Sequence, residues 1–294
     1  MTGTLYIIAT PIGNLGDISY RAIETLKLVD IIAAEDTRKS LILLNKYNIK
    51  KPVFSNHKFN EASKLKFFID KLLLGENIGL ISDAGMPCIS DPGYILVKEA
   101  IENNIATTCV PGASASITSV SLSGFDTSSF SFLGFLPRDK KGLLNIFNKI
   151  SLDTLNNVFI FYESPKRIIK TIEFLNNEFP NFSLCLCNDL TKKFEKIYRG
   201  SPSKILNELK ENEAFDKGEY VLVVNTNIVK NKNNNIIKDA PLTNTLSIEA
   251  LLVDYLIKNK NETLKTAIKE VNSKYKNLSK NEIYKASLNL KNIL

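Results

Sequence analysis

Histidine and cysteine are scarce in this 294-residue chain, which has one histidine, four cysteines and no tryptophan. A single histidine, His57, excludes a metal site built from several histidines, and Ser-His or Cys-His catalysis would require His57 itself as the base. The cysteines are scattered without CxxC spacing, so they indicate neither a zinc site nor a disulfide framework. Cys185 and Cys187 share one face of a predicted strand, and we expect them to be core thiols.

Long apolar runs are also absent. No stretch approaches the ~20 residues of a membrane-spanning helix, and residues 4–9 lack the preceding basic segment of a signal peptide. We therefore expect a cytoplasmic protein. The formal charge of +7 permits an acidic partner such as nucleic acid, although a lysine- and asparagine-rich composition could produce the same excess without any binding role.

Three common catalytic signatures are missing. The first loop, with Pro11 and a Gly13-x-x-Gly16 spacing, is a poor match to the G-x-G-x-x-G dinucleotide fingerprint, and no GK[ST] phosphate loop is present. No nucleophile and base stand in the pattern of a hydrolase. A group transfer whose activation resides in a cofactor fits these absences better.

The stretch 78–93 organises the rest of the chain. Its apolar residues 78–81 predict a buried strand, and the loop that follows holds Ser82, Asp83 and Gly85. Asp91 followed by Pro92 predicts a helix N-cap with proline in the first helical position. A strand end, a glycine-containing loop and a carboxylate together predict a ligand site at the edge of an α/β sheet.

Comparable loops follow predicted strands in both halves of the chain, after Ala9, Ala34, Ile81, Val110, Tyr162 and Cys187. Two α/β halves with facing loops predict a cleft between domains, which is a preferred place for a cofactor. Ser164-Pro165 predicts a second capped helix start.

Two of these loops have alternative interpretations. Glu35 and Asp36 are either first-turn acids of a helix or part of the site, with Arg38 and Lys39 facing an anionic substrate. Residues 111–116 open a helix whose N-terminus would bind a carboxylate or phosphate, although serine there is commonly only a cap.

We predict four segments: an α/β domain over 1–115, a second over 116–227, a linker over 228–244 and a helical tail over 245–294. Ser279 and Glu282 form a capping box that opens the last helix. Three short helices are similar to a helix-turn-helix, which could contact nucleic acid, but such a tail is more often a packing or dimerisation module.

Several blocks occur in a characteristic order. They are residues 5–17, 33–38, 82–93, 111–114, 132–138, 162–167, 190–192 and 218–224. Together they resemble the 16S rRNA cytidine-2'-O-methyltransferases of the tetrapyrrole-methylase superfamily over about residues 4–226. Small departures from the family pattern occur at Met86, at Cys88 and in residues 55–58, and they concern the shape of the donor pocket and the role of His57.

The resemblance implies two α/β domains with S-adenosylmethionine between them, a homodimer, and 2'-O-methylation of a cytidine in the decoding region of 16S rRNA. By the same resemblance, ten residues would contact the cofactor. They are Pro11, Asp83, Ala84, Gly85, Ser114, Ala115, Tyr162, Glu163, Leu190 and Gly218.

The transfer places two further demands on the residues. A ribose hydroxyl is a poor nucleophile, and Asp83 and Glu163 are candidates to accept its proton, unless either only binds the cofactor. Seven basic residues lie near predicted loop tips and would meet rRNA phosphates. They are Arg38, Lys39, Arg138, Lys166, Arg167, Lys192 and Arg199.

Three other functions compete with this one. A tetrapyrrole-precursor C-methyltransferase would use the same architecture but gives little reason for the helical tail. A nicotinamide-dependent enzyme would use Glu35 as its ribose-binding acid. A non-enzymatic RNA-binding protein would use the basic loops and the tail alone.

Overall fold

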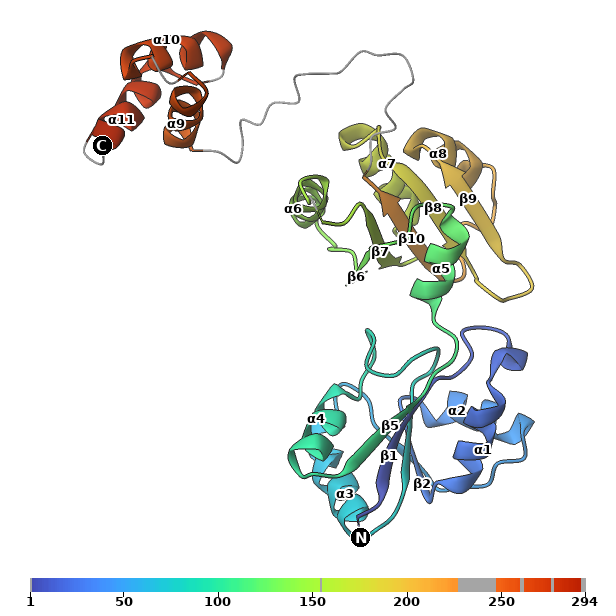
Figure 1. Cartoon of the computed structure of the whole chain (residues 1–294). Coiled ribbons are helices and arrows are strands. Elements are labelled where there is room, and N and C mark those ends of the chain that lie inside the picture. Colours follow the sequence, from blue (N-terminus) through green and yellow to red (C-terminus); the bar gives the residue numbers. More distant parts are fainter. Residues whose placement is uncertain (1, 154, 227–246, 260–261, 276–277, 292–294) are drawn as a thin grey trace. The chain divides into compact units, whose positions relative to one another are not determined.

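The computed structural model describes residues 2–153, 155–226, 247–259, 262–275 and 278–291 (Figure 1). The chain divides into two compact units, Met1–Val229 and Lys230–Leu294. The first unit holds two separate five-stranded sheets, and the second holds three helices. The predicted linker, 228–244, lies outside the described residues, and the predicted domain boundaries at 115 and 227 stay predictions.

The first sheet is entirely parallel, with the strand order β3-β2-β4-β1-β5. Parallel pairing brings the carboxyl ends of all five strands, and the loops that follow them, to one edge of the sheet. The strands are β1 (Thr4–Ile8), β2 (Ile31–Ala34), β3 (Val53–Ser55), β4 (Ile78–Ile81) and β5 (Ala106–Val110).

Helices cover both faces of this sheet (Figure 1). Leu26 of α1 (Tyr20–Leu28) and Leu44 of α2 (Thr37–Lys46) share one buried cluster, whereas Phe68 of α3 (Glu61–Leu73) and Leu96 of α4 (Tyr94–Glu102) share the other. Each such side chain stabilises the fold by about 1.5–3 kcal/mol through burial. A short 3-10 turn, Leu15–Asp17, precedes α1.

The second sheet is mixed, with the order β6-β7-β10-β8-β9; β6 is parallel to β7 and the other pairs are antiparallel. Its helix α5 (Ala115–Ser123) shares a buried cluster with Cys185 and Cys187, while α6 (Lys140–Ser151), α7 (Ile168–Glu178) and α8 (Pro202–Lys210) pack on the alternate side chains. Both thiols are fully buried, so the prediction of core cysteines is confirmed. The strands are β6 (Ser131–Phe135), β7 (Val158–Glu163), β8 (Ser183–Asn188), β9 (Lys196–Gly200) and β10 (Tyr220–Asn225).

The start of α4 differs from the sequence prediction, and the assignment of Asp91 as its N-cap is wrong. The helix begins at Tyr94, and its N-cap is Gly93 with φ +124°. One carboxylate oxygen of Glu61, on α3, accepts hydrogen bonds from the backbone N–H groups of Gly93 at 2.7 Å and Ile95 at 3.2 Å. The neighbouring helix α3 therefore supplies the capping acceptor, and Asp91 lies in the loop before α4.

The start of α7 also differs, and the cap predicted at Ser164-Pro165 is wrong. This helix begins at Ile168 after the N-cap residue Arg167. Residues 164–167 form a turn instead, in which the Arg167 N–H donates to the Ser164 carbonyl at 2.9 Å. The turn forms because the carboxylate of Glu163 binds the Ser164 N–H at 2.6 Å and also pairs with Arg167.

The second unit contains α9 (Ile248–Lys258), α10 (Leu264–Lys274) and α11 (Lys280–Lys291), packed around a core of their own. The capping box is confirmed, because Glu282 accepts from the Ser279 N–H at 2.9 Å and donates its own N–H to the Ser279 hydroxyl at 3.2 Å. Among the helices that the structure describes, none is both long enough and apolar enough to cross a bilayer.

Replacing Glu61 tests the cap supplied by α3. Because Glu61→Ala removes a buried acceptor of two N–H groups, we expect it to lower the free energy of unfolding by about 2 kcal/mol, measured by urea denaturation. The control Glu102→Ala removes only an exposed pair with Lys98 and should change this free energy by less than about 1 kcal/mol. Equal losses in the two variants would contradict the capping role.

Candidate active site

Two cavities lie at the carboxyl edge of the first sheet. The first cavity has a volume of about 310 Å³ and the second cavity of about 300 Å³. Ile12, Ala84 and Glu219 line both, so the two cavities adjoin. Ile12 belongs to the loop after β1 of the first sheet but packs in the buried cluster of the second sheet. The site is therefore formed where the two sheets meet.

The loop after β4 forms one wall of the first cavity and is held there by backbone bonds. Thr10 and Gly85 exchange two backbone hydrogen bonds, of 2.9 Å and 3.1 Å, and Gly85 has φ +80°. Farther along, Cys88 (φ +70°) and Ser90 (φ +64°) occupy the left-handed region, which costs each residue about 1 kcal/mol or more. The loop turns sharply at these residues, and Ser90 and Asp91 line the cavity.

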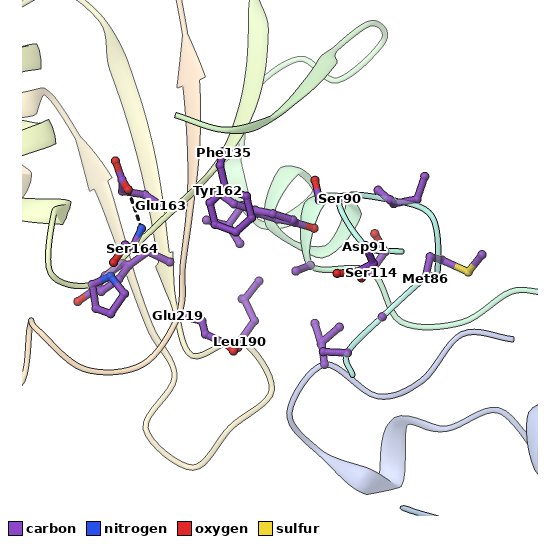
Figure 2. Close-up of a pocket in the computed structure, with 18 residues that line it drawn as sticks. Met86, Ser90, Asp91, Ser114, Phe135, Tyr162, Glu163, Ser164, Leu190 and Glu219 are labelled. Atoms are coloured by element: carbon purple, nitrogen blue, oxygen red, sulfur yellow. Dashed lines mark hydrogen bonds between the residues drawn. The ribbon is translucent and has the colours of Figure 1, made fainter. Parts of the chain in front are cut away.

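A row of hydroxyl groups lies across the first cavity. The Tyr162 hydroxyl hydrogen-bonds Ser116, whose hydroxyl lies 3.1 Å from that of Ser114. Figure 2 shows the Tyr162 ring pointing toward Ser90, Asp91 and Ser114. Ser114 occupies the N-cap position of α5, but its side chain accepts no hydrogen bond from the first N–H groups of that helix.

Asp91 is the most perturbed carboxyl group of the first cavity. Burial, helped by the negative charges of Glu35 and Asp83, raises the pKa of Asp91 to about 7, against a hydrogen bond with Ser82 that lowers it. Burial also raises the pKa of Glu35. Among the described residues, no three acidic, thiol or imidazole side chains are arranged to hold a metal ion.

Glu163 is fully buried and already has three protein partners. Its carboxylate accepts from the Ser164 N–H, from the Thr171 hydroxyl at 2.8 Å and from Arg167. In Figure 2 it lies on the far side of Tyr162 from Asp91 and Ser114. These contacts favour a role in holding the turn after β7, and its role as proton acceptor stays a prediction.

Asp83 lines the second cavity and joins β4 to the start of α2. One carboxylate oxygen accepts from the Asp36 N–H at 2.9 Å, and the other accepts from the Lys39 ammonium at 2.7 Å. Asp36 is the N-cap of α2, accepting from the Arg38 N–H at 2.9 Å. Asp36 therefore caps the helix, whereas Glu35 accepts from the Asp83 N–H at 3.3 Å and lines neither cavity. A role of the acidic pair in the site stays a prediction.

Most of the predicted cofactor residues gather around the first cavity. Pro11 and Asp83 line the second cavity instead, and Gly218 lines neither. At Gly218 (φ +81°) a side chain would collide with the Asp189 carboxylate, 2.2 Å from the position of a Cβ. Residues of the predicted set in the first cavity are Ala84, Gly85, Ser114, Ala115, Tyr162, Glu163 and Leu190.

The seven predicted basic residues divide into three groups. Lys39 and Lys192 line the second cavity, whereas Arg38, Arg138 and Lys166 are exposed outside both cavities. The other two are engaged with backbone carbonyls. Arg199 donates to Leu122, and Arg167 donates to Leu136 and Pro137 at 3.1 Å each.

The sequence prediction missed several residues of the site. Asp91 was assigned to a helix cap, although its place in a loop rich in glycine and proline was a usable signal. Ser90 and Phe135 lie in the blocks 82–93 and 132–138 but are not among the implied cofactor residues, and Ile42 lies in no block; the fold places all three at the cavities.

The fold is shared with enzymes of one class. A family model described as Tetrapyrrole (Corrin/Porphyrin) Methylases matches residues 4–206. A solved structure of diphthine synthase has a TM-score of 0.58 at 14% identity, over 76% of this chain and 89% of that one. Uroporphyrin-III-C-methyltransferase from Thermus thermophilus has a TM-score of 0.51 at 13% identity, over 76% and 94%. The chain therefore belongs to the tetrapyrrole-methylase family, and the two solved structures share its fold.

Curated relatives narrow the assignment. Three similar proteins are named Ribosomal RNA small subunit methyltransferase I. The protein from Halalkalibacterium halodurans is 44% identical over 76% of both chains, and the one from Mycoplasmopsis pulmonis is 46% identical over 74% of this chain and 96% of the relative. The protein from Buchnera aphidicola subsp. Schizaphis graminum is 39% identical over 98% of this chain and 96% of the relative. The chain belongs to the ribosomal RNA small subunit methyltransferase I family.

The raised pKa of Asp91 predicts a pH-dependent stability. An unfolded aspartate titrates near about 3.9, so between about pH 4 and about pH 7 the folded chain binds more protons here than the unfolded chain, and rising pH destabilises the fold. Asn cannot titrate, so Asp91→Asn should gain melting temperature relative to wild type as the pH rises from about 5 to about 8. A difference in melting temperature that does not change with pH would contradict the burial of this carboxyl group.

Replacing Arg167 tests whether this residue has a structural role or an RNA-binding role. Arg167→Ala strands the buried Glu163 carboxylate and should lower the free energy of unfolding by about 3 kcal/mol in urea denaturation. The neighbouring exposed residue provides the control, since Lys166→Ala should change it by no more than about 0.5 kcal/mol. Stability unchanged in Arg167→Ala would contradict the structural role.

Proposed function

We propose that this chain transfers a methyl group from S-adenosylmethionine to the ribose 2'-hydroxyl of cytidine 1402 in the decoding region of 16S rRNA. The relatives' names support small-subunit ribosomal RNA as substrate. The observation that carries the proposal is the first cavity, where seven residues implied for donor binding meet, next to a second cavity with lysines at its lining.

The residues of the first cavity fit this donor. Its volume of about 310 Å³ is within the range of small-molecule sites. Phe135, Tyr162 and Leu190 offer apolar surface for an adenine ring, and the N-terminus of α5 suits a carboxylate. The carboxyl group of Asp91 suits the positive charge of a sulfonium or an ammonium group.

When bound, the donor supplies an activated methyl carbon that bonds to the ribose oxygen as its carbon–sulfur bond breaks and leaves a thioether. The chain's residues would hold the hydroxyl in line with that carbon, and positioning supplies much of the rate. Asp83 is the better placed of the two predicted proton acceptors, because it lines the second cavity beside Ala84, which both cavities share. Its bond with Lys39 fixes the direction of the carboxylate.

The predicted homodimer and cytoplasmic location are parts of this proposal. Exposed apolar side chains on α5 and β6 support the dimer: Ile117 and Leu133 are 50% and 41% exposed. Light scattering of the full chain measures the molar mass directly. A monomer at assay concentration would remove the dimer from the proposal and leave the reaction untouched.

The test of the reaction is transfer of labelled methyl from S-adenosylmethionine to small subunits that lack the modification, in parallel with a precorrin-type tetrapyrrole. We expect an alkali-resistant ribose methyl on the decoding-region cytidine. Label found only in the tetrapyrrole would favour the C-methyltransferase, and a chain that binds subunits but neither binds donor nor transfers methyl would be an RNA-binding protein.

Asp83→Asn tests the proton acceptor. The amide keeps the size of the side chain but accepts protons poorly, so we expect kcat to fall about 10²-fold while the Kd for donor, from calorimetry, changes little. Asp139→Asn is the matched control, because Asp139 caps α6 outside both cavities. Normal kcat with weakened donor binding would assign Asp83 to the donor instead.

A further inference from the structure

We infer that the second cavity is the acceptor site, which receives a single ribonucleoside of the RNA with its flanking phosphates on Lys39 and Lys192. This inference rests on the proposed function and adds to it the place of the substrate. The cavity's volume of about 300 Å³ suits one nucleoside rather than a duplex or a macrocycle.

The polar groups that line the second cavity are of two kinds, oxygen-bearing side chains and lysine ammonium groups. Thr10, Ser82 and Asp83 supply acceptor oxygens, which match the hydroxyl donors of a ribose. Lys39 and Lys192 supply ammonium groups, which match phosphates. The lining therefore offers partners for both the sugar and the backbone of RNA.

The walls between these groups are apolar. Leu15, Ile42 and Leu43 line the same cavity, and Ile42 is 64% exposed, so it stands at the mouth. An apolar wall beside the ribose-binding groups suits the face of a base. RNA bases that are taken out of their stack are commonly held by such contacts.

The position of the cavity fits methyl transfer. The acceptor oxygen must lie about 3–3.5 Å from the donor methyl, so donor and acceptor need adjoining chambers. Ile12, Ala84 and Glu219 are common to both cavities, and Asp83 precedes the shared Ala84 directly. An acceptor hydroxyl beside Asp83 would therefore be next to the donor cavity.

Lys39 lies on α2 and Lys192 in the loop between β8 and β9, and each has carboxylate partners within the protein. Lys39 lies 2.7 Å from the Asp83 carboxylate, whereas Lys192 lies 2.8 Å from Asp189 and 3.0 Å from Glu219. Both ammonium groups remain solvent-accessible, so a phosphate can take over part of their hydrogen bonding. For Lys39, that exchange would release Asp83 toward the acceptor hydroxyl.

Blocking the mouth of the cavity tests the inference. Ile42→Trp places a large ring at the lining, while Leu41→Trp, on the preceding and 45% exposed residue of α2, lines neither cavity. We expect Ile42→Trp to lower kcat/KM for small subunits at least about 10-fold, with donor Kd unchanged by calorimetry. Leu41→Trp should match wild type in both measurements.

A charge variant gives a second readout that does not depend on accommodating tryptophan. Lys192→Ala should raise the KM for small subunits and reduce the slope of log affinity against log salt concentration by about 1. Lys204→Ala, an exposed lysine of α8 with a carboxylate partner, is the matched control and should leave that slope unchanged.

The outcomes separate this inference from the proposed function. If wild type methylates subunits and Ile42→Trp and Lys192→Ala do so equally well, the second cavity is not the acceptor site. If Ile42→Trp loses donor binding, the cavity belongs to the donor and the inference is overturned. If wild type itself binds donor but methylates no subunit, the proposed function fails and the acceptor site fails with it.

Discussion

The parallel pairing of the first sheet is the constraint on which the site depends. Because β1, β2 and β4 run in the same direction, the loops carrying Thr10, Glu35 and Asp83 all leave from one edge. The two backbone bonds between Thr10 and Gly85 then hold the β1 and β4 loops together. Ala84, beside that bridge, lies where the two cavities meet.

The two cavities differ in the charged groups that line them. In the first cavity, Asp91 is half-buried near the negative Glu35 and Asp83, and this environment disfavours its ionised form. In the second cavity, Asp83 already has a cationic partner in Lys39. The proposed cationic donor would meet a carboxyl group in the first cavity, and the proposed anionic backbone would meet Lys39 and Lys192 at the second.

The fold was largely predictable because its signals are local. Short apolar runs such as 31–34 and 78–81 matched β2 and β4 residue for residue, and the capping box at Ser279 opens α11 as expected. The helix starts after Asp91 and Ser164 were not predictable by the same rules. At α4 the carboxylate of Glu61, on α3, took the backbone bonds that a local cap would have made, and at α7 the carboxylate of Glu163 holds Ser164 and Arg167 in a turn before the helix.

The sequence predicted many of the residues that line the site but not how the two cavities divide them. Resemblance pointed to residues such as Ser114 and Tyr162, which line one cavity, but a sequence pattern contains no information on how loops divide a cleft. The separation of Asp83 from Asp91, into adjoining cavities, depends on the path of the loop through the left-handed residues Cys88 and Ser90. For the same reason the resemblance did not single out Phe135 within the block 132–138, and no motif indicated Ile42.

A crystal structure of the full chain with S-adenosylhomocysteine would test the central claim most directly, because it locates the donor product. The account predicts density in the first cavity, against Tyr162, Ser114 and the loop from Ala84 to Asp91, with the second cavity open to solvent. Density in the second cavity, between Lys39 and Lys192, or no binding at millimolar concentration, would contradict the account.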